Sequence, residues 1–142
     1  MNLSSFFKDK NVVITGHTGF KGSWLSQILS QLGANIYAFS LDIPTNPAHY
    51  ELLEVKFSRD ERIDLADNSK VSNFILESQP DFVFHLAAQP LVLESYKDEY
   101  RTYLSNSFGT MNILESLKQY NQDCIAIIIT SDKCYENTDK EV

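Results

Sequence analysis

The fold of this chain is decided by the stretch Ile14-Thr15-Gly16-His17-Thr18-Gly19-Phe20-Lys21-Gly22. An apolar, β-rich run at residues 12–14 leads into it, and apolar residues at helical spacing follow it between positions 24 and 32. The pattern predicts a strand, a glycine turn and a helix in immediate succession. Glycines let the backbone turn tightly and approach a ligand closely, while the first N–H groups of a helix can bind phosphate. The turn is therefore a candidate pyrophosphate site, the alternative being that its glycines serve packing alone.

Strands and helices are expected to alternate along the whole chain. The predicted strands cover residues 11–15, 35–40, 59–63, 81–86 and 124–130, and the main predicted helices cover residues 21–32, 71–79 and 100–119. Short helical turns are expected near residues 6–7 and 50–54. This alternation predicts the α/β class, with a Rossmann-type, doubly wound parallel sheet and helices on both faces. Because no repeat or linker interrupts the pattern, residues 1–142 are expected to form one domain.

The composition restricts the possible partners. The 142 residues include 12 Lys and Arg against 19 Asp and Glu, which gives a formal net charge of −7. An acidic balance without a basic stripe argues against nucleic acid and anionic membranes as partners. No apolar run reaches the ~20 residues of a membrane span, and the first residues lack a signal-peptide pattern. The two cysteines, Cys124 and Cys134, match neither a disulfide framework nor a metal motif. These features favour a soluble cytoplasmic protein without a metal site.

Polar residues follow the second predicted strand, where a sheet of this kind binds ligands. Ser40 ends that strand, and Asp42 is an acid about 20 residues beyond the glycines, the position that binds the ribose hydroxyls of NAD. The alternative for Asp42 is a plain loop carboxylate. Because residues 40–47 contain no Lys or Arg to receive a 2′-phosphate, the sequence favours NAD over NADP.

Two histidines near these loops are not expected to be catalytic. His17 is interpreted as a turn residue chosen for backbone tolerance. His85 has apolar neighbours in the fourth predicted strand and is interpreted as a hydrogen-bonded core histidine. The small residues that follow His85 would let the backbone approach a cofactor closely.

The spacing of Gly16, Gly19 and Gly22 resembles the pattern of the extended short-chain dehydrogenase/reductase superfamily. Within that superfamily the sequence resembles the CDP-glucose 4,6-dehydratase family in four strings, at residues 17–25, 44–47, 85–92 and 130–137. The last string contains Ser131-Asp132-Lys133, where the related dTDP-glucose enzymes carry Thr-Asp-Glu. The resemblance implies a lyase that converts CDP-glucose to CDP-4-keto-6-deoxyglucose and recycles its NAD.

The resemblance also implies which residues bind the cofactor. Asp64 and Leu65 would hold the adenine, although Asp64 is alternatively a cap of the following turn. The complete set implied to bind NAD is Gly16, Thr18, Gly19, Phe20, Lys21, Gly22, Ser40, Asp42, Asp64, Leu65, Leu86, Ala87, Ala88, Gln89, Asn106 and Thr130.

By the same resemblance, three residues after the fifth predicted strand carry the chemistry. Ser131 would hydrogen-bond the C4 hydroxyl of the sugar, Asp132 would protonate the departing C6 hydroxyl, and Lys133 would take the C5 proton. A general acid needs a raised carboxyl pKa, and a basic lysine needs a pKa well below its usual ~10.4. The alternative is that Asp132 and Lys133 form only an ion pair at the end of the strand.

Two features depart from the superfamily pattern. No Tyr has a Lys four residues later, so the Tyr-x-x-x-Lys pair that extracts the hydroxyl proton is absent from these residues. That pair belongs on the helix after the fifth strand. We therefore expect the chain to be the amino-terminal part of a longer, homodimeric enzyme, with a Rossmann domain incomplete at its carboxyl end and the substrate domain absent. Glu94 stands where the family commonly has a basic or neutral residue, which weakens any phosphate contact there.

Two other functions are compatible with the sequence. A dinucleotide-binding module without catalysis would explain the missing Tyr-x-x-x-Lys pair, but it has no use for Ser131-Asp132-Lys133. Another extended short-chain enzyme, such as a sugar-nucleotide epimerase, is disfavoured by Asp132 and Lys133.

Overall fold

A parallel sheet forms the centre of the molecule. The computed structural model describes residues 3–131, and its five strands lie in the order β3-β2-β1-β4-β5 with every neighbouring pair parallel. In chain order the strands are β1 (Asn11–Thr15), β2 (Asn35–Ser40), β3 (Phe57–Arg62), β4 (Phe82–His85) and β5 (Ile125–Ile128). The doubly wound parallel sheet predicted from the sequence is confirmed.

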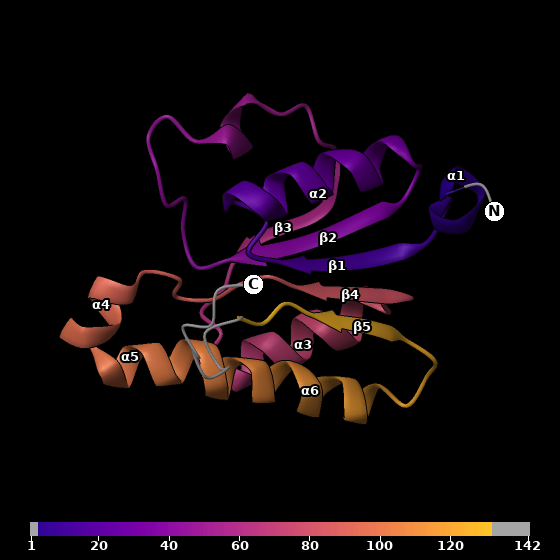
Figure 1. Ribbon diagram of the computed structural model, residues 1–142. Helices are drawn as coiled ribbons and strands as arrows, with labels where there is room; N and C mark the ends of the chain where they lie inside the picture. The colour runs from indigo at the N-terminus through magenta and orange to yellow at the C-terminus, as the bar shows by residue number, and fades with distance from the viewer. Residues whose placement is uncertain (1–2, 132–142) are drawn as a thin grey trace, which may run out of the picture.

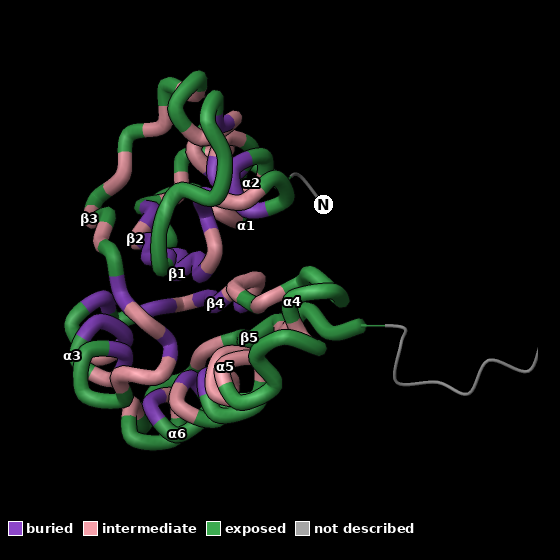
Figure 2. Tube along the Cα trace, turned by 90° about the vertical axis from the view of Figure 1, so that its left-hand side faces the viewer, coloured by how far each residue is buried: buried purple, intermediate pink, exposed green. Residues whose placement is uncertain are grey.

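Helices cover both faces of this sheet (Figure 1). One face carries α2 (Phe20–Gln31), and the opposite face carries α3 (Asn68–Ser78) and α6 (Gly109–Tyr120). Figure 2 shows the buried residues concentrated where these layers meet. The cluster on the α2 side contains Val12, Ile14, Leu29, Ile36, Ala38 and Phe82. The cluster on the other side contains Val13, Phe39, Ile63, Leu65, Val71, Phe74, Ile75, Val83 and Ile113.

Shorter helical segments lie between these elements. α1 (Leu3–Phe7) precedes β1, and the 3₁₀ helix η1 (His49–Leu52) lies in the loop between β2 and β3. α4 (Val92–Lys97) and α5 (Glu99–Tyr103) are followed by the π-helical segment η2 (Leu104–Phe108), which runs directly into α6.

The observed helices differ from those expected from the sequence in two places. The single regular helix expected over residues 100–119 is interrupted by the wider turns of η2 between α5 and α6. Helix α4 lies outside the predicted elements, because Val92, Leu93 and Tyr96 are 61%, 75% and 77% exposed and give no buried stripe. The other elements agree with the predictions, with boundaries that differ by no more than three residues.

The strand order creates a switch point beside β1. The chain passes from β1 to β2 and β3 on one side and then returns to β4 on the other. Thr15, the last residue of β1, pairs with Phe39 of β2 and with His85 of β4. The segments that leave β1 and β4 therefore meet at the crevice where doubly wound sheets bind their ligands.

His85 connects this part of the sheet to α6. Its Nε2 atom lies 3.0 Å from the hydroxyl of Thr110, which itself donates to the carbonyl of Asn106, so the histidine must be the donor. Its Nδ1 atom then accepts from the hydroxyl of Thr15 at 2.7 Å. Burial lowers the pKa of His85 to about 4. The interpretation of His85 as a hydrogen-bonded core histidine is confirmed.

The titration of His85 predicts a loss of stability in mild acid. An unfolded histidine takes up a proton near pH ~6.5, whereas folded His85 resists protonation down to about pH 4. The contribution of neutral His85 to the free energy of unfolding is therefore complete above pH ~6.5 and is lost as the pH falls toward 4. The loss amounts to about 2 kcal/mol by pH 5. Urea unfolding at pH 7.5 and pH 5 should show this difference, and His85→Gln should reduce it. An unchanged pH dependence in the variant would contradict the assignment.

Candidate functional site

Gly16 allows the loops after β1 and β4 to touch. Its φ of +75° lies in the left-handed region, and its N–H donates to the carbonyl of Phe39 at 2.9 Å. A Cβ atom at this position would lie 2.8 Å from the backbone of Ala87. The contact brings the two loops together at the switch point, and any side chain on Gly16 would push them apart.

The other two glycines of the turn have different roles. A Cβ atom on Gly22 would lie 2.1 Å from the carbonyl oxygen of Gly16, so Gly22 is needed for helix α2 to pack against the turn. Gly19 has an extended backbone, with φ −74° and ψ 168°, and an added Cβ would meet only the Gly16 oxygen at 3.4 Å. The chain itself therefore does not require glycine at position 19, and the bare backbone there leaves space above the turn.

The first turn of α2 supplies free hydrogen-bond donors. The helix begins at Phe20, and the N–H groups of Phe20, Lys21 and Gly22 have no partner within a helix that starts there. Thr18, two residues before α2, is tied to the end of β2 and to the loop that follows it. Its N–H donates to Ser40 Oγ at 3.3 Å, and its hydroxyl donates to the carbonyl of Asp42 at 2.6 Å. The turn thus presents the N-terminus of α2 to the crevice.

The buried side chain of His17 anchors this turn to β2 and β3. Its side chain is fully buried, and its ring contacts the hydroxyl of Ser40 and the carboxylate of Asp60 at 2.9 and 3.0 Å. The interpretation of His17 as a residue chosen for backbone tolerance is wrong, because its φ is not positive. Sequence reasoning missed Asp60, which lies on β3 far along the chain and carries no local signal that would link it to the turn.

The loop after β4 is held by a reciprocal pair of hydrogen bonds. Asn106, in η2, accepts from the N–H of Gln89 at 2.7 Å and donates to its carbonyl at 3.0 Å. The N–H of Ala87 donates to Thr15 Oγ1 at 3.1 Å. Leu86 and Ala87 are half-buried and Ala88 is exposed, so this loop lies open beside the glycine turn.

Asp64 has two partners in the structure. One carboxylate oxygen caps the N–H of Ala66 at 2.9 Å, and the other accepts from Arg101 of α5 at 2.7 Å. Partial burial would raise the pKa of Asp64, but these two partners outweigh it and lower the pKa. The neighbouring Leu65 is buried, and its carbonyl accepts from Asn112 at 2.7 Å. The capping alternative is thus observed, and the adenine contact stays a prediction.

The end of β5 lies at the same edge of the sheet. Thr130 and Ser131 are exposed there, whereas Asp132 and Lys133 lie outside the described residues. Within residues 3–131 no group of His, Cys, Asp and Glu is arranged to hold a metal ion. No helix in that range is long and apolar enough to cross a membrane.

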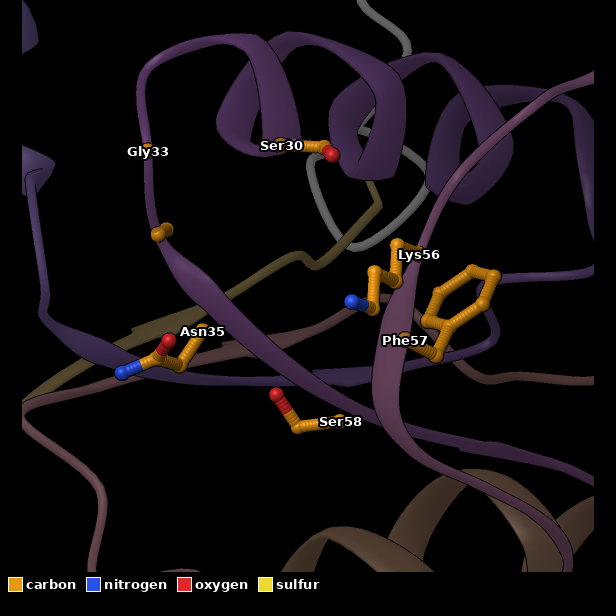
Figure 3. Close-up of a pocket in the computed structure, with 7 residues that line it drawn as sticks. Ser30, Gly33, Asn35, Lys56, Phe57 and Ser58 are labelled. Atoms are coloured by element: carbon orange, nitrogen blue, oxygen red, sulfur yellow. The ribbon is translucent and has the colours of Figure 1, made fainter.

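Two hollows lie away from this edge. One, of about 400 Å³, lies between the end of α2 and the start of β3 and is lined by Ser30, Gly33, Ala34, Asn35, Lys56, Phe57 and Ser58 (Figure 3). The other, of about 600 Å³, lies beside α1 and the starts of β4 and β5. Both open at the amino ends of strands, opposite the glycine turn.

The sequence profile of the GDP-mannose 4,6-dehydratase family matches residues 13–141, from β1 past the end of β5. The chain belongs to this family. The matched stretch includes the whole glycine turn from Gly16 to Gly22 and the loop that follows β4.

Characterised relatives resemble the chain over most of its length. It is 45% identical over 134 residues to CDP-glucose 4,6-dehydratase of Salmonella typhimurium, a match that covers 94% of this chain and 37% of that protein. It is 30% identical to CDP-paratose 2-epimerase of Salmonella typhi, with 87% of this chain and 37% of that protein covered. The chain thus spans little more than a third of the length of these relatives.

Solved structures share the same fold. An epimerase from Methanothermobacter thermautotrophicus superposes with a TM-score of 0.80 at 22% identity, covering 100% of this chain and 41% of that one. UDP-glucose 4-epimerase from Thermus thermophilus, solved as a complex with NAD, gives a TM-score of 0.70 at 28% identity and covers 80% of this chain and 35% of that one.

Because the glycines have different roles, the same Gly→Ala substitution should lower the free energy of unfolding by different amounts at each position. Gly22→Ala should destabilise the fold by about 1–3 kcal/mol or more, because the methyl group overlaps the Gly16 carbonyl. Gly19→Ala, the matched control, should change stability by less than about 1 kcal/mol, since its Cβ makes no such overlap. Urea unfolding of both variants gives the comparison. Equal costs would show that the turn does not pack as described.

Proposed function

We propose that this chain is the NAD-binding part of a cytoplasmic sugar-nucleotide 4,6-dehydratase that converts CDP-glucose to CDP-4-keto-6-deoxyglucose. The observation that carries the proposal is the open space above Gly19, directly in front of the free N–H groups of α2. The 45% identity to the Salmonella typhimurium enzyme supports the dehydration reaction and the CDP-linked substrate.

The residues at the switch point fit NAD. A pyrophosphate would lie over Gly19 and accept from the N–H groups of Phe20, Lys21 and Gly22. Asp42 would bind the ribose hydroxyls, and Asp64, whose side chain is 36% exposed, would reach the adenine. The complex of the Thermus thermophilus epimerase with NAD supports the choice of cofactor. When bound, NAD supplies a group that accepts and later returns a hydride.

Three residues are proposed to act on the sugar. Ser131 would orient the C4 hydroxyl for oxidation, which acidifies the proton on C5. Lys133 would then remove that proton while Asp132 protonates the C6 hydroxyl as it leaves, so that one water molecule is lost. The carboxyl end of β5 neighbours that of β4, which supports their placement beside the cofactor.

We further propose that residues 1–142 form a dinucleotide-binding domain that is completed by later residues of a longer enzyme, with a separate substrate domain. The match to little more than a third of each curated relative supports this division. The nucleotide of the substrate would be bound by that second domain.

Binding of NAD⁺ tests the proposed function directly. Calorimetric titration of the chain with millimolar NAD⁺ should give a saturable heat, and NADP⁺ should bind more weakly because Asp42 would repel the 2′-phosphate. Gly19→Val should abolish binding, since its side chain fills the space that the pyrophosphate needs. The assignment of NAD as the cofactor would be contradicted if the folded chain gave no heat with NAD⁺ or if it bound NADP⁺ more tightly.

The proposed base can be tested in a full-length enzyme that begins with this sequence. Lys133→Ala should slow formation of the 4-keto-6-deoxy sugar by about 10²–10⁴-fold, the usual contribution of a general base. Lys118→Ala, which removes an exposed lysine from α6, is the matched control. Equal rates in the two variants would make Lys133 a structural residue, and an epimerised product from the parent enzyme would favour the epimerase alternative.

We also propose that the enzyme is a homodimer formed through α5 and α6. Tyr100, Tyr103 and Met111 are 76%, 64% and 55% exposed on these helices, and exposed apolar patches often mark protein–protein interfaces. Sedimentation should therefore show self-association that Met111→Glu weakens. Lys118→Glu, on the same helix, changes an exposed charged position and should have less effect. A parent protein that stays monomeric at high concentration would contradict the proposal.

A further inference from the structure

A chain of hydrogen bonds behind the glycine turn runs from Asp60 to the backbone of Thr18. Asp60 Oδ1 lies 3.0 Å from His17 Nε2, and His17 Nδ1 lies 2.9 Å from Ser40 Oγ. Ser40 Oγ then accepts the N–H of Thr18 at 3.3 Å. His17 and Ser40 are 0% and 4% exposed, so water does not compete for the bonds that join His17, Ser40 and Thr18.

The direction of every bond in this chain follows from its first member. A carboxylate only accepts hydrogen bonds, so His17 Nε2 must donate to Asp60. Burial lowers the pKa of His17 and outweighs the opposing effects of the Asp60 carboxylate and the Phe39 carbonyl, so the ring is neutral at pH 7. Nδ1 is therefore an acceptor and takes the hydroxyl proton of Ser40, whose lone pairs then face the N–H of Thr18.

The carboxylate of Asp60 accepts hydrogen bonds from two further side chains. Tyr50 of η1 donates to its Oδ2 atom, and Arg62 donates to its Oδ1 atom at 2.6 Å. Partial burial would raise the pKa of Asp60, but these partners and His17 outweigh it and lower the pKa, so Asp60 is ionised. Within residues 3–131, Tyr50, Asp60 and Arg62 are the titratable and charged groups that face His17.

We propose that His17 is a positioning residue for phosphate binding. Asp60 selects the tautomer of His17, this tautomer turns the Ser40 hydroxyl toward the ring, and the hydroxyl fixes Thr18 against the end of β2. Because only Gly19 separates Thr18 from the first turn of α2, fixing Thr18 aims the N–H groups of that turn at the phosphates. The inference rests on the proposed NAD function and adds a group that does not itself touch the ligand.

The tautomer can be measured without any cofactor. Nitrogen chemical shifts of the His17 ring at pH 7 should show a protonated Nε2 and a bare Nδ1. A protonated Nδ1 in a protein that still binds NAD⁺ would overturn the inference and leave the proposed function intact. A wild-type protein that does not bind NAD⁺ would overturn both.

The effect on binding separates positioning from simple stability. Asp60→Leu should weaken NAD⁺ about 5–10-fold through the loss of the directing hydrogen bond, whereas Asp60→Asn, whose amide oxygen can still accept from Nε2, should stay within about twofold of the wild type. The control is Ser78→Ala, which removes a buried hydroxyl bonded to Phe74 in α3, far from the turn, and should leave NAD⁺ affinity unchanged.

If Asp60→Leu does not fold, His17→Phe serves in its place, because it keeps a ring in the cavity and removes both hydrogen bonds. It should weaken NAD⁺ by a similar factor. The positioning role would be overturned if folded Asp60→Leu or His17→Phe bound NAD⁺ as tightly as Ser78→Ala does. It would also be overturned if Asp60→Leu and Asp60→Asn lost the same amount of NAD⁺ affinity.

Discussion

The carbonyl of Gly16 leaves no room for a side chain on Gly22, and the packing of α2 on the glycine turn depends on that close contact. It brings the start of α2 onto the end of β1, and the bare Cα of Gly16 brings the loop after β4 to the same point. The glycines at positions 16 and 22 thereby allow the end of β1, the start of α2 and the loop after β4 to meet at the switch point of the sheet. The crevice between them is the natural place for a ligand in a doubly wound fold.

The two sides of β1 are organised by the same kind of hydrogen-bond chain. On one side, neutral His17 accepts from the hydroxyl of Ser40, which receives a backbone N–H from the glycine turn. On the other, neutral His85 accepts from the hydroxyl of Thr15, which receives the N–H of Ala87. In both cases a buried imidazole fixes a hydroxyl, and the hydroxyl fixes a loop that borders the crevice. Buried networks of this kind rigidify a site only when every member is satisfied, as here.

Local patterns made much of this arrangement predictable from the sequence. The passage from β1 through the turn to α2 has a strong local signature, and alternating apolar runs predict the parallel sheet. Even the core role of His85 follows from its apolar neighbours. The separate roles of Gly19 and Gly22 do not, because both are simply glycines in a motif and only the distances to Gly16 distinguish them.

What the sequence concealed is contact between distant residues. His17 and Asp60 are hydrogen-bonded across β2, and the sequence around each residue carries no pattern that predicts the other as its partner. The ion pair between Asp64 and Arg101 is hidden for the same reason, as its members lie just after β3 and on α5. Helix α4 was missed for a different reason, since its apolar side chains face solvent and lack the periodic burial that marks a helix.

We propose that the N-terminus of α2 receives the phosphates of a dinucleotide. Backbone amide spectra recorded during a titration with NAD⁺ test it most directly, because each N–H group reports separately. The largest shifts should fall on Phe20, Lys21 and Gly22, with smaller ones on Ala87. Shifts confined to the hollow around Ser30, Lys56 and Phe57, or to no part of the glycine turn, would contradict it.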